Sequence, residues 1–464
     1  MKSNLLNAIT TNDAYTENGA LTHSTSGKNC VDFFFQIGAM RGADENRLIK
    51  NFAQAYGENK LDALKVLFWS RDVLQGAGER RSFRVILRDL ANREPDVVRK
   101  NLHLVSVLGR WDDLLEFVGT PIETDALNVI KNGLENKNGL TAKWMPRKGS
   151  NAALLRKHLG LTPKQYRKLL VGLSNTVEQK MCANEWSSIQ YKTVPSIAMK
   201  NYHKAFYKHD LDGMKNFMQK VEKGEETINS KALYPHEIAK HFLYAKNPHN
   251  SDVLEAQWKA LPNFMEKNEK RILPIVDTSG SMYGLPIEVS ISLGIYISER
   301  NKGLFENAFI TFSEKPTLQY LQGSLANRVH SLEKTNWGYN TNLQAVFNLI
   351  LKKAVVNNVS EDEMPTTLLI LSDMEFDYAV SDTINHDIIK EKYAQHGYKL
   401  PEIVFWNIEA RHDNNIPIKS NQQGVALVSG FSPSILTSLL SGDLEPEKVM
   451  RKMIDKDRYK EIAV

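Results

Sequence analysis

Apolar side chains recur three and four positions apart through residues 30–270, in segments separated by short breaks with Gly, Pro or Asp. This spacing places the apolar side chains on one face of a helix. Two such segments are LDALKVLFWSRDVL (61–74) and PKQYRKLLVGLSNTVEQK (163–180). The pattern predicts a helical N-terminal domain, a stack of antiparallel helices that we expect to form a HEAT-like solenoid.

The pattern changes at about residue 271, where short continuous apolar runs begin to alternate with helical stretches. The expected strands are RILPIVD, ENAFITFS, TTLLILSDM, PEIVFWNIE and GVALVSG, and helices are predicted at 286–301, 342–356, 383–396 and 433–440. This alternation is typical of an α/β domain with a doubly wound parallel sheet. The predicted organisation is an N-terminal arm (1–29), a helical domain (30–270) and an α/β domain (271–464).

Composition indicates a soluble globular protein, with 42% hydrophobic and 24% charged residues. The amino end is polar and resembles no signal peptide, and no apolar run approaches the ~20 residues that span a bilayer. Cys30 and Cys182 form no disulfide framework and are expected to be buried free thiols. We therefore expect a cytoplasmic protein without a membrane partner.

The net charge of +5 conceals an asymmetry, because residues 1–270 contain 40 Lys/Arg against 30 Asp/Glu, and residues 271–464 contain 19 against 24. The excess is concentrated in residues 137–220, which have 16 basic and four acidic side chains. Cations neutralise phosphates, and the interspersed aromatic residues can stack on unpaired bases or form a helical core. The candidate RNA-binding residues are Lys143, Arg147, Lys148, Arg156, Lys157, Lys164, Arg167 and Lys168.

The loop DTSGS (277–281) follows the first expected strand. A nucleophilic serine would favour GxSxG, but Asp277 stands two residues before Ser279, and the phosphate-loop motif GxxxxGK[ST] is absent. One carboxylate and two hydroxyls on alternating positions suit Mg²⁺, although a helix cap is the alternative. Asp373 ends another expected strand, and functional residues of parallel sheets collect at these carboxyl ends.

The series Asp277-x-Ser279-x-Ser281, followed by Thr341 and Asp373, resembles the metal-ion-dependent adhesion site of von Willebrand factor A domains. The resemblance implies that the two serines and Thr341 coordinate Mg²⁺ or another divalent cation, with both aspartates helping directly or through water. It also implies that an acidic group of a protein partner takes the open coordination position. Asn340 and Asn342 depart from the common Gly-Thr-Asp pattern, but the threonine is kept.

Motifs of the helical half resemble a family known as domain of unknown function 2828. They are GAGERRSFR (76–84), GRWDDLLEF (109–117), AKWMPRK (142–148), TPKQYRKLL (162–170) and YKTVPSIAMKNYHKAF (191–206). The architecture of this family is similar to that of the Ro autoantigen. There, a ring of helical repeats called the TROVE module is closed by a von Willebrand A domain and binds small noncoding or misfolded RNA. The resemblance implies a ribonucleoprotein with a small noncoding or structured RNA as partner.

Three functions are compatible with these features. The first is RNA binding by the basic helical half, with protein binding at the metal site. The second is a metal-dependent protein-interaction scaffold without RNA, and the third is a metal-dependent nuclease. Because the metal loops lack a second carboxylate cluster and a general base, the sequence favours a binding protein over an enzyme. GAGER is expected to be a turn between helices, the acids of GRWDD to belong to a helix start, and His209-Asp210 to hold no metal.

Overall fold

The computed structural model describes residues 13–243, 251–311, 316–333, 342–376, 385–412, 415–440 and 444–464. Its N-terminal half begins with a small antiparallel hairpin and is otherwise helical, as predicted. The elements are β1 (Asp13–Tyr15), β2 (Leu21–His23), α2 (Asn29–Ile37), α3 (Glu45–Glu58), α4 (Lys60–Arg71), α5 (Arg81–Arg93), α6 (Pro95–Leu108), η1 (Trp111–Phe117), α7 (Glu123–Glu135), α8 (Gly139–Trp144), α9 (Ser150–His158), α10 (Pro163–Ser174), α11 (Val177–Cys182), η2 (Trp186–Ser188), η3 (Tyr191–Thr193), α12 (Ser196–His209), α13 (Leu211–Glu222), α14 (Pro235–Leu243) and α15 (Asp252–Lys259).

Local sequence explains where these helices begin and which face they bury. In α5, the buried residues Phe83, Ile86 and Leu90 follow the helical spacing seen in the sequence. Helix α10 begins with a capping box, in which Thr162 and Gln165 each accept the other's backbone N–H. Pro163, which follows Thr162, occupies the first turn of the helix, where its missing N–H costs nothing. None of the described helices is long and apolar enough to cross a membrane.

The C-terminal half is built on a six-stranded sheet with the order β5-β4-β3-β6-β7-β8. The strands are β3 (Ile272–Val276), β4 (Ala308–Thr311), β5 (Thr317–Tyr320), β6 (Thr367–Ser372), β7 (Glu402–Asn407) and β8 (Val425–Ser429). The five strands predicted from apolar runs are confirmed, and they pair in parallel. The prediction of a wholly parallel sheet is wrong, because β5 pairs antiparallel with β4. The sequence reading missed β5 because this edge strand has four largely exposed residues and no buried apolar run.

Four helices of the C-terminal half follow the predicted ranges: α16 (Leu285–Arg300), α18 (Leu343–Val356), α19 (Asn385–Gln395) and α20 (Leu436–Leu439). The sequence analysis did not predict α17 (Leu325–Glu333) and α21 (Pro446–Ile454). Helix α16 contacts β3, β4 and β6. It approaches β3 so closely that a Cβ on Gly294 would lie 2.4 Å from a methyl group of Val276. A larger residue at position 294 would therefore push the helix off the sheet.

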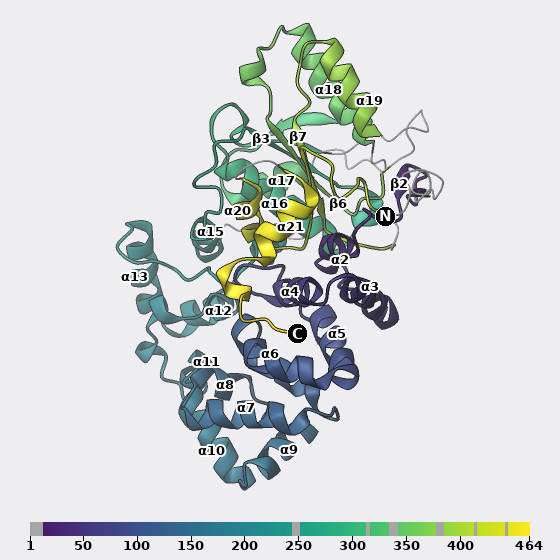
Figure 1. The fold of residues 1–464 in the computed structure, drawn as a ribbon. Helices are drawn as coiled ribbons and strands as arrows, with labels where there is room; N and C mark the ends of the chain where they lie inside the picture. The colour runs from purple at the N-terminus through teal and green to yellow at the C-terminus, as the bar shows by residue number, and fades with distance from the viewer. Residues whose placement is uncertain are drawn as a thin grey trace.

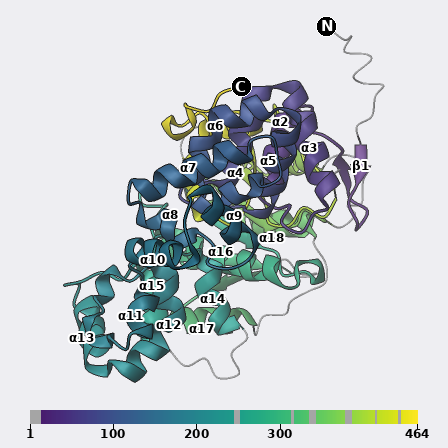
Figure 2. The same ribbon diagram turned by 90° about the horizontal axis from the view of Figure 1, so that it is seen from below.

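The helical half contacts the sheet half at both of its ends. Helix α2 packs against β8, the last strand, and α14 packs against α16 and α17. Between these contacts the helices run away from the sheet to α9 and α10 and then return through α12 (Figure 1). Figure 2 shows the same course along an arc from α2 to α13, with α14 beside α17. The chain thus makes a closed circuit in which the sheet half joins the two ends of the helical half.

Glycines permit the close approach at the β8 end of this circuit. The N–H of Gly38 donates to Ser429 Oγ (3.1 Å), and that hydroxyl donates to the carbonyl of Phe34 (2.8 Å). Gly430 has a φ of +114°, and a Cβ there would lie 2.8 Å from the Cβ of Ala77. Ala77 belongs to the GAGER motif, which forms the connection between α4 and α5, as predicted. This motif therefore joins the two halves of the molecule.

The C-terminal residues also connect the halves, through buried and partly buried ion pairs. Arg451 of α21 binds the buried carboxylate of Asp62 in α4, with one oxygen at 2.6 Å. Arg458 donates to Asp72 at 2.5 Å, and the Tyr459 hydroxyl donates to the same carboxylate at 2.9 Å. Asp62 and Asp72 belong to the helical half, and their partners follow the last strand of the sheet. These charged hydrogen bonds therefore hold α4 against the C-terminal segment.

Candidate functional site

The DTSGS loop leaves the carboxyl end of β3 and turns its polar side chains inward. Asp277 is fully buried, and its Oδ1 accepts the backbone N–H of Ser279 at 2.9 Å. The hydroxyls of Ser279 and Ser281 lie 2.9 Å apart. The loop thus brings together the three oxygen-bearing side chains that the sequence placed on alternating positions.

The neighbouring strand β6 adds the second aspartate. Val276 and Leu371 are paired in register, so Asp277 and Asp373 leave adjacent strands at the same edge of the sheet. The strand order reverses between β3 and β6, because β4 lies on one side of β3 and the later strand β6 lies on the other. Ligands of such sheets bind at this topological switch point. Asp373 is buried, and its Oδ2 accepts no hydrogen bond from any described residue. Arg411 Nε lies 3.8 Å from that oxygen.

The electrostatics of this edge favour a bound cation. Burial raises the pKa of Asp277, and the nearby Asp373 carboxylate raises it further. Burial likewise raises the pKa of Asp373, against hydrogen bonding by Ser281 and the charge of Arg411. Two adjacent buried carboxylates, one with an oxygen that accepts no hydrogen bond, are costly without more counter-charge than Arg411 provides, and hydroxyls beside them complete an oxygen donor set. The residues present therefore fit Mg²⁺ or a similar hard cation.

Four of the five predicted metal ligands are thus close together, and Thr341 lies outside the described residues. Within the described part of the chain, no three His, Cys, Asp or Glu side chains form a metal-binding group. The predicted ligand set contains only two such side chains, Asp277 and Asp373, because its other three members are hydroxyl groups.

Sequence reasoning missed two residues at this edge of the sheet, Ser372 and Arg411. It also missed the contacts that the N-terminal segment makes there. Ser372 donates to Asp277 Oδ2 at 2.5 Å, and its position immediately before Asp373 was the available signal. Arg411 gave no signal, because it follows a different strand, β7. The N-terminal segment reaches the loop after Asp373, where the N–H of Glu17 donates to Glu375 Oε2 at 2.6 Å and the hydroxyl of Thr16 donates to the Phe376 carbonyl at 2.6 Å.

The eight predicted RNA-binding residues lie on consecutive elements of the helical half, from α8 to α10. Lys143 is on α8, Arg147 and Lys148 follow it, Arg156 and Lys157 are on α9, and Lys164, Arg167 and Lys168 are on α10. Lys143 and Arg156 are partly exposed and the other six are exposed. Burial raises the pKa of the Tyr166 hydroxyl to about 12, whereas the charges of Arg147 and Arg156 lower it. These two arginines therefore lie near the same tyrosine.

None of these eight side chains forms an ion pair with an acidic residue in the described part of the chain. By contrast, Lys131 pairs with Glu135, and Lys200 pairs with Glu237. Arg147 donates to the hydroxyl of Ser174 and Arg156 to the carbonyl of Ala152, both neutral groups. We call this set of eight residues the basic face. No acidic side chain among the described residues compensates its positive charge.

Five aromatic residues of the same region make packing contacts within the protein. Tyr191, Phe206 and Phe217 belong to a core that joins η3, α12 and α13. Trp186 stacks on His209, with ring centroids 4.4 Å apart, and the Arg110 guanidinium covers Trp144 at 3.8 Å. The alternative reading of these aromatics as packing residues is therefore confirmed for these positions.

Other candidate motifs also have structural roles. In GRWDD, Asp113 is buried and accepts from Arg71 Nε (2.7 Å) and from the N–H of Arg110 (2.8 Å) at the start of η1, as predicted. Asp210 caps α13 and accepts the hydroxyl of Tyr191 at 2.8 Å. Cys30 is buried, as predicted, but Cys182 is exposed. The prediction for Cys182 is wrong because it ends α11, a short helix without buried residues.

Two family models match the chain, each described as a domain of unknown function. DUF2828 matches residues 16–140 and 145–270, and DUF7788 matches residues 271–462. The two matches meet between α15 and β3, where helices give way to the sheet.

One relative and one solved structure align with most of the chain. An uncharacterized protein of Acanthamoeba polyphaga mimivirus, L728, is 29% identical over 493 residues, which cover 93% of this chain and 85% of that protein. The crystal structure of the Deinococcus radiodurans Ro (RSR) protein aligns with 91% of this chain and 93% of its own, at 14% identity and a TM-score of 0.34.

Proposed function

The chain belongs to the DUF2828 family, and from this premise we propose that it is an RNA-binding protein whose basic helical face contacts RNA. The α/β half, in this proposal, is a von Willebrand A-like domain that holds a divalent cation at the carboxyl edge of its sheet. The helices would form a TROVE-like, HEAT-like module, and the partner would be a small noncoding or structured RNA. No catalytic step is part of the proposal.

The basic face is the observation that carries RNA binding. Eight cationic side chains lie between Lys143 and Lys168, and none is paired with an acid in the described part of the chain. Exposed, uncompensated cations attract a polyanion, and binding releases the counterions condensed on its phosphates. Because Tyr191, Phe206 and Phe217 are packed in a core and the Arg110 guanidinium covers Trp144, we expect contacts mainly to phosphate and sugar, with modest sequence preference.

The test is RNA binding by a charge-reversed face. We would measure fluorescence anisotropy of a labelled single-stranded RNA and of a labelled hairpin, with wild-type protein and with Arg147→Glu/Lys148→Glu/Lys164→Glu/Arg167→Glu. A matched control is Lys352→Glu/Lys353→Glu/Lys390→Glu/Lys399→Glu, which reverses four exposed lysines of the sheet half. Loss of binding only in the first variant supports the proposal; equal binding by both variants contradicts it.

The metal centre is proposed from the clustered oxygens of β3 and β6. Ser279, Ser281 and Thr341 would hold Mg²⁺, and Asp277 and Asp373 would act directly or through water. The bound cation supplies a positive centre that can accept a carboxylate from a protein partner. Around it, Asp277 orients the loop through the N–H of Ser279, and Ser372 holds Asp277 in place.

A second candidate function is a metal-dependent protein-interaction scaffold without RNA. It is favoured by exposed apolar side chains in the segment that follows Ser281, where Tyr283 is 86% and Leu285 is 41% exposed. Pull-downs with and without EDTA, using wild type and Asp277→Ala, would separate this candidate from the first. Partner capture that needs both the cation and Asp277, in a protein that binds no RNA, would favour the scaffold.

A further inference from the structure

A pocket opens between the elements that follow one another from α8 to α12. Its volume is about 640 Å³, within the range of small-molecule sites. One wall comes from α8 and its first residues, another from the link between α10 and α11, and a third from η3 and the start of α12. Apolar groups in the lining are Leu140, Val177, Ile189, Val194 and Ala198, and polar groups include Asn138, Ser174, Thr176, Gln190 and Thr193.

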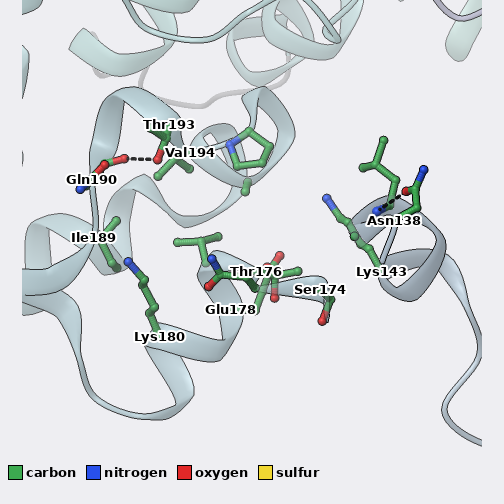
Figure 3. A pocket seen from close by; sticks show the side chains of 16 residues that line it. Asn138, Lys143, Ser174, Thr176, Glu178, Lys180, Ile189, Gln190, Thr193 and Val194 are labelled. Carbon is green, nitrogen blue, oxygen red and sulfur yellow. Dashed lines mark hydrogen bonds between the residues drawn. The ribbon is translucent and has the colours of Figure 1, made fainter. Parts of the chain in front are cut away.

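Two lysines give the pocket a positive charge. Figure 3 shows the side chains of Lys143 and Lys180 on opposite sides of the space, with Thr176 and Glu178 between them in this view. The Lys143 amino group lies 5.5 Å from the ring centre of Trp144, and Lys180 donates to the carbonyl of Ser188 at 2.9 Å. Neither lysine pairs with an acid among the described residues. The pocket can therefore accept an anionic group.

Glu178 is the single acid among the described lining residues. It lies near Tyr202 of α12, because burial and this carboxylate raise the pKa of the Tyr202 hydroxyl. Lys143 and Lys180 outnumber this acid, so the lining keeps a net positive charge.

The start of α12 adds polar backbone to the wall. This helix has 14 residues, and Pro195, which precedes it, provides no side-chain cap. The first N–H groups of such a helix have no partner within the helix, so they reinforce the attraction of an anion that the lysines provide. Asn138 also lines the pocket, and its side-chain oxygen accepts the N–H of Leu140 at 2.9 Å.

We propose that this pocket binds one nucleotide, with its phosphate attracted by the charges of Lys143 and Lys180 and its base against the apolar lining. The combination of cations, amide and hydroxyl groups, and apolar wall matches the three parts of that ligand. The nucleotide is a free one or a unit of an RNA strand, which share this chemistry. Arg147 of the basic face donates to Ser174, a lining residue, at 3.4 Å, so the pocket adjoins that face. The RNA form of the inference rests on the proposed function.

The test uses AMP, adenosine and a 5′-phosphorylated octamer of adenylate as probes. Isothermal titration of wild-type protein should show AMP binding, with adenosine at least about tenfold weaker because a charge-assisted contact is lost. Lys143→Gln/Lys180→Gln should weaken AMP binding by about tenfold or more for the same reason. The matched variant Lys204→Gln/Lys215→Gln removes two exposed lysines of α12 and α13 outside the pocket and should bind AMP as wild type does.

A second measurement needs no variant. AMP should protect Lys143 and Lys180 of the wild-type chain from acetylation by an N-hydroxysuccinimide ester, read by mass spectrometry, and should leave Lys204 and Lys215 unprotected. Absence of AMP binding at millimolar concentration, equal binding by the pocket variant, or no protection of either pocket lysine overturns the inference.

The outcomes also separate this inference from the proposed function. AMP binding in a protein that binds no RNA supports a free nucleotide as ligand and contradicts the RNA proposal. Competition between AMP and the octamer supports a nucleotide unit of RNA. Octamer binding that depends on Arg147, Lys148, Lys164 and Arg167, with no effect of AMP or of the pocket variant, overturns the inference and leaves RNA binding intact.

Discussion

Ser372, the last residue of β6, donates a hydrogen bond of 2.5 Å to Asp277 Oδ2, the carboxylate at the end of β3. The two residues are 95 positions apart in sequence, and both are fully buried. Ser372 thus positions Asp277, one acid of the candidate metal centre, and Ser372 itself directly precedes Asp373, the other acid. The centre is thus a property of the paired strands and not of the DTSGS loop alone.

Magnesium should stabilise the folded protein through this centre. With Mg²⁺ at about 100 times its dissociation constant, binding to the folded state alone contributes about 2.7 kcal/mol. We expect Mg²⁺ to raise the melting temperature of wild type, followed by differential scanning fluorimetry, and to leave Asp277→Ala unchanged. Ca²⁺ and Mg²⁺ should be compared at equal ionic strength. A Mg²⁺-dependent rise of equal size in Asp277→Ala would place the cation elsewhere.

Removing Asp113 should destabilise the helical half strongly. Asp113 and its partner Arg71 are both buried, so Asp113→Ala would leave an unpaired buried guanidinium, which costs about 3–5 kcal/mol. The control is Asp89→Ala, whose partner Arg93 is 47% exposed, and its expected cost is about 0–1 kcal/mol. Urea unfolding followed by circular dichroism measures both. Similar losses for the two variants would mean that the buried pair contributes no more than a surface pair.

A methyl group at Gly430 should weaken the join between the two halves. Gly430→Ala introduces both a positive-φ strain of about 1–2 kcal/mol and a contact with Ala77, where overpacking costs about 1–3 kcal/mol more. Gly424→Ala is the matched control, because Gly424 also has a positive φ (+74°) but has open space around its Cβ position. Thermal unfolding should show a larger loss for position 430. Limited proteolysis should cut the 430 variant faster between α4 and α5.

RNA binding should depend on salt in proportion to the phosphate contacts. For single-stranded RNA, the slope of log K against log salt is about −0.7 per phosphate neutralised. The charge-neutral variant Arg147→Gln/Lys148→Gln/Lys164→Gln/Arg167→Gln should therefore flatten the slope by about 3 if each residue contacts one phosphate. Anisotropy titrations from low to moderate salt measure this. An unchanged slope would show that RNA binds away from the basic face.

His236 should make the protein less stable in mild acid. Burial lowers the pKa of this histidine from 6.5 to about 3, helped by the charges of Arg41, Lys240 and Lys200. The unfolded chain therefore binds a proton below about pH 6.5 that the folded chain refuses until about pH 3, so stability falls as the pH falls through that window. The limiting slope is about 1.4 kcal/mol per pH unit. In His236→Phe the loss between pH 7 and 5 should be smaller than in wild type, whereas His396→Gln, on an exposed site, should match wild type.

The sequence could predict most of the sheet because its central strands are buried on both faces. Such strands appear as continuous apolar runs, as in Leu368 to Leu371, and the residues after them reach one edge. This is why Asp277, Ser279, Ser281 and Asp373 could be grouped from the sequence. Strand β5 could not be found in this way, because its residues are largely exposed and its pairing with β4 replaces burial as the stabilising interaction.

The tertiary structure alone determined which aromatic residues are packed in a core and which distant residues are in contact. Spacing alone could not separate an aromatic residue that stacks on a base from one that packs in a core, and only the fold shows Tyr191 and Phe206 facing each other. Likewise, the pairing of Ser372 with Asp277, the approach of Arg411 to Asp373 and the contact of Gly430 with Ala77 join residues far apart in the chain. Local sequence determines elements because their hydrogen bonds and apolar faces depend on neighbouring residues. The candidate sites depend on which elements pack together, and that is determined by the whole core.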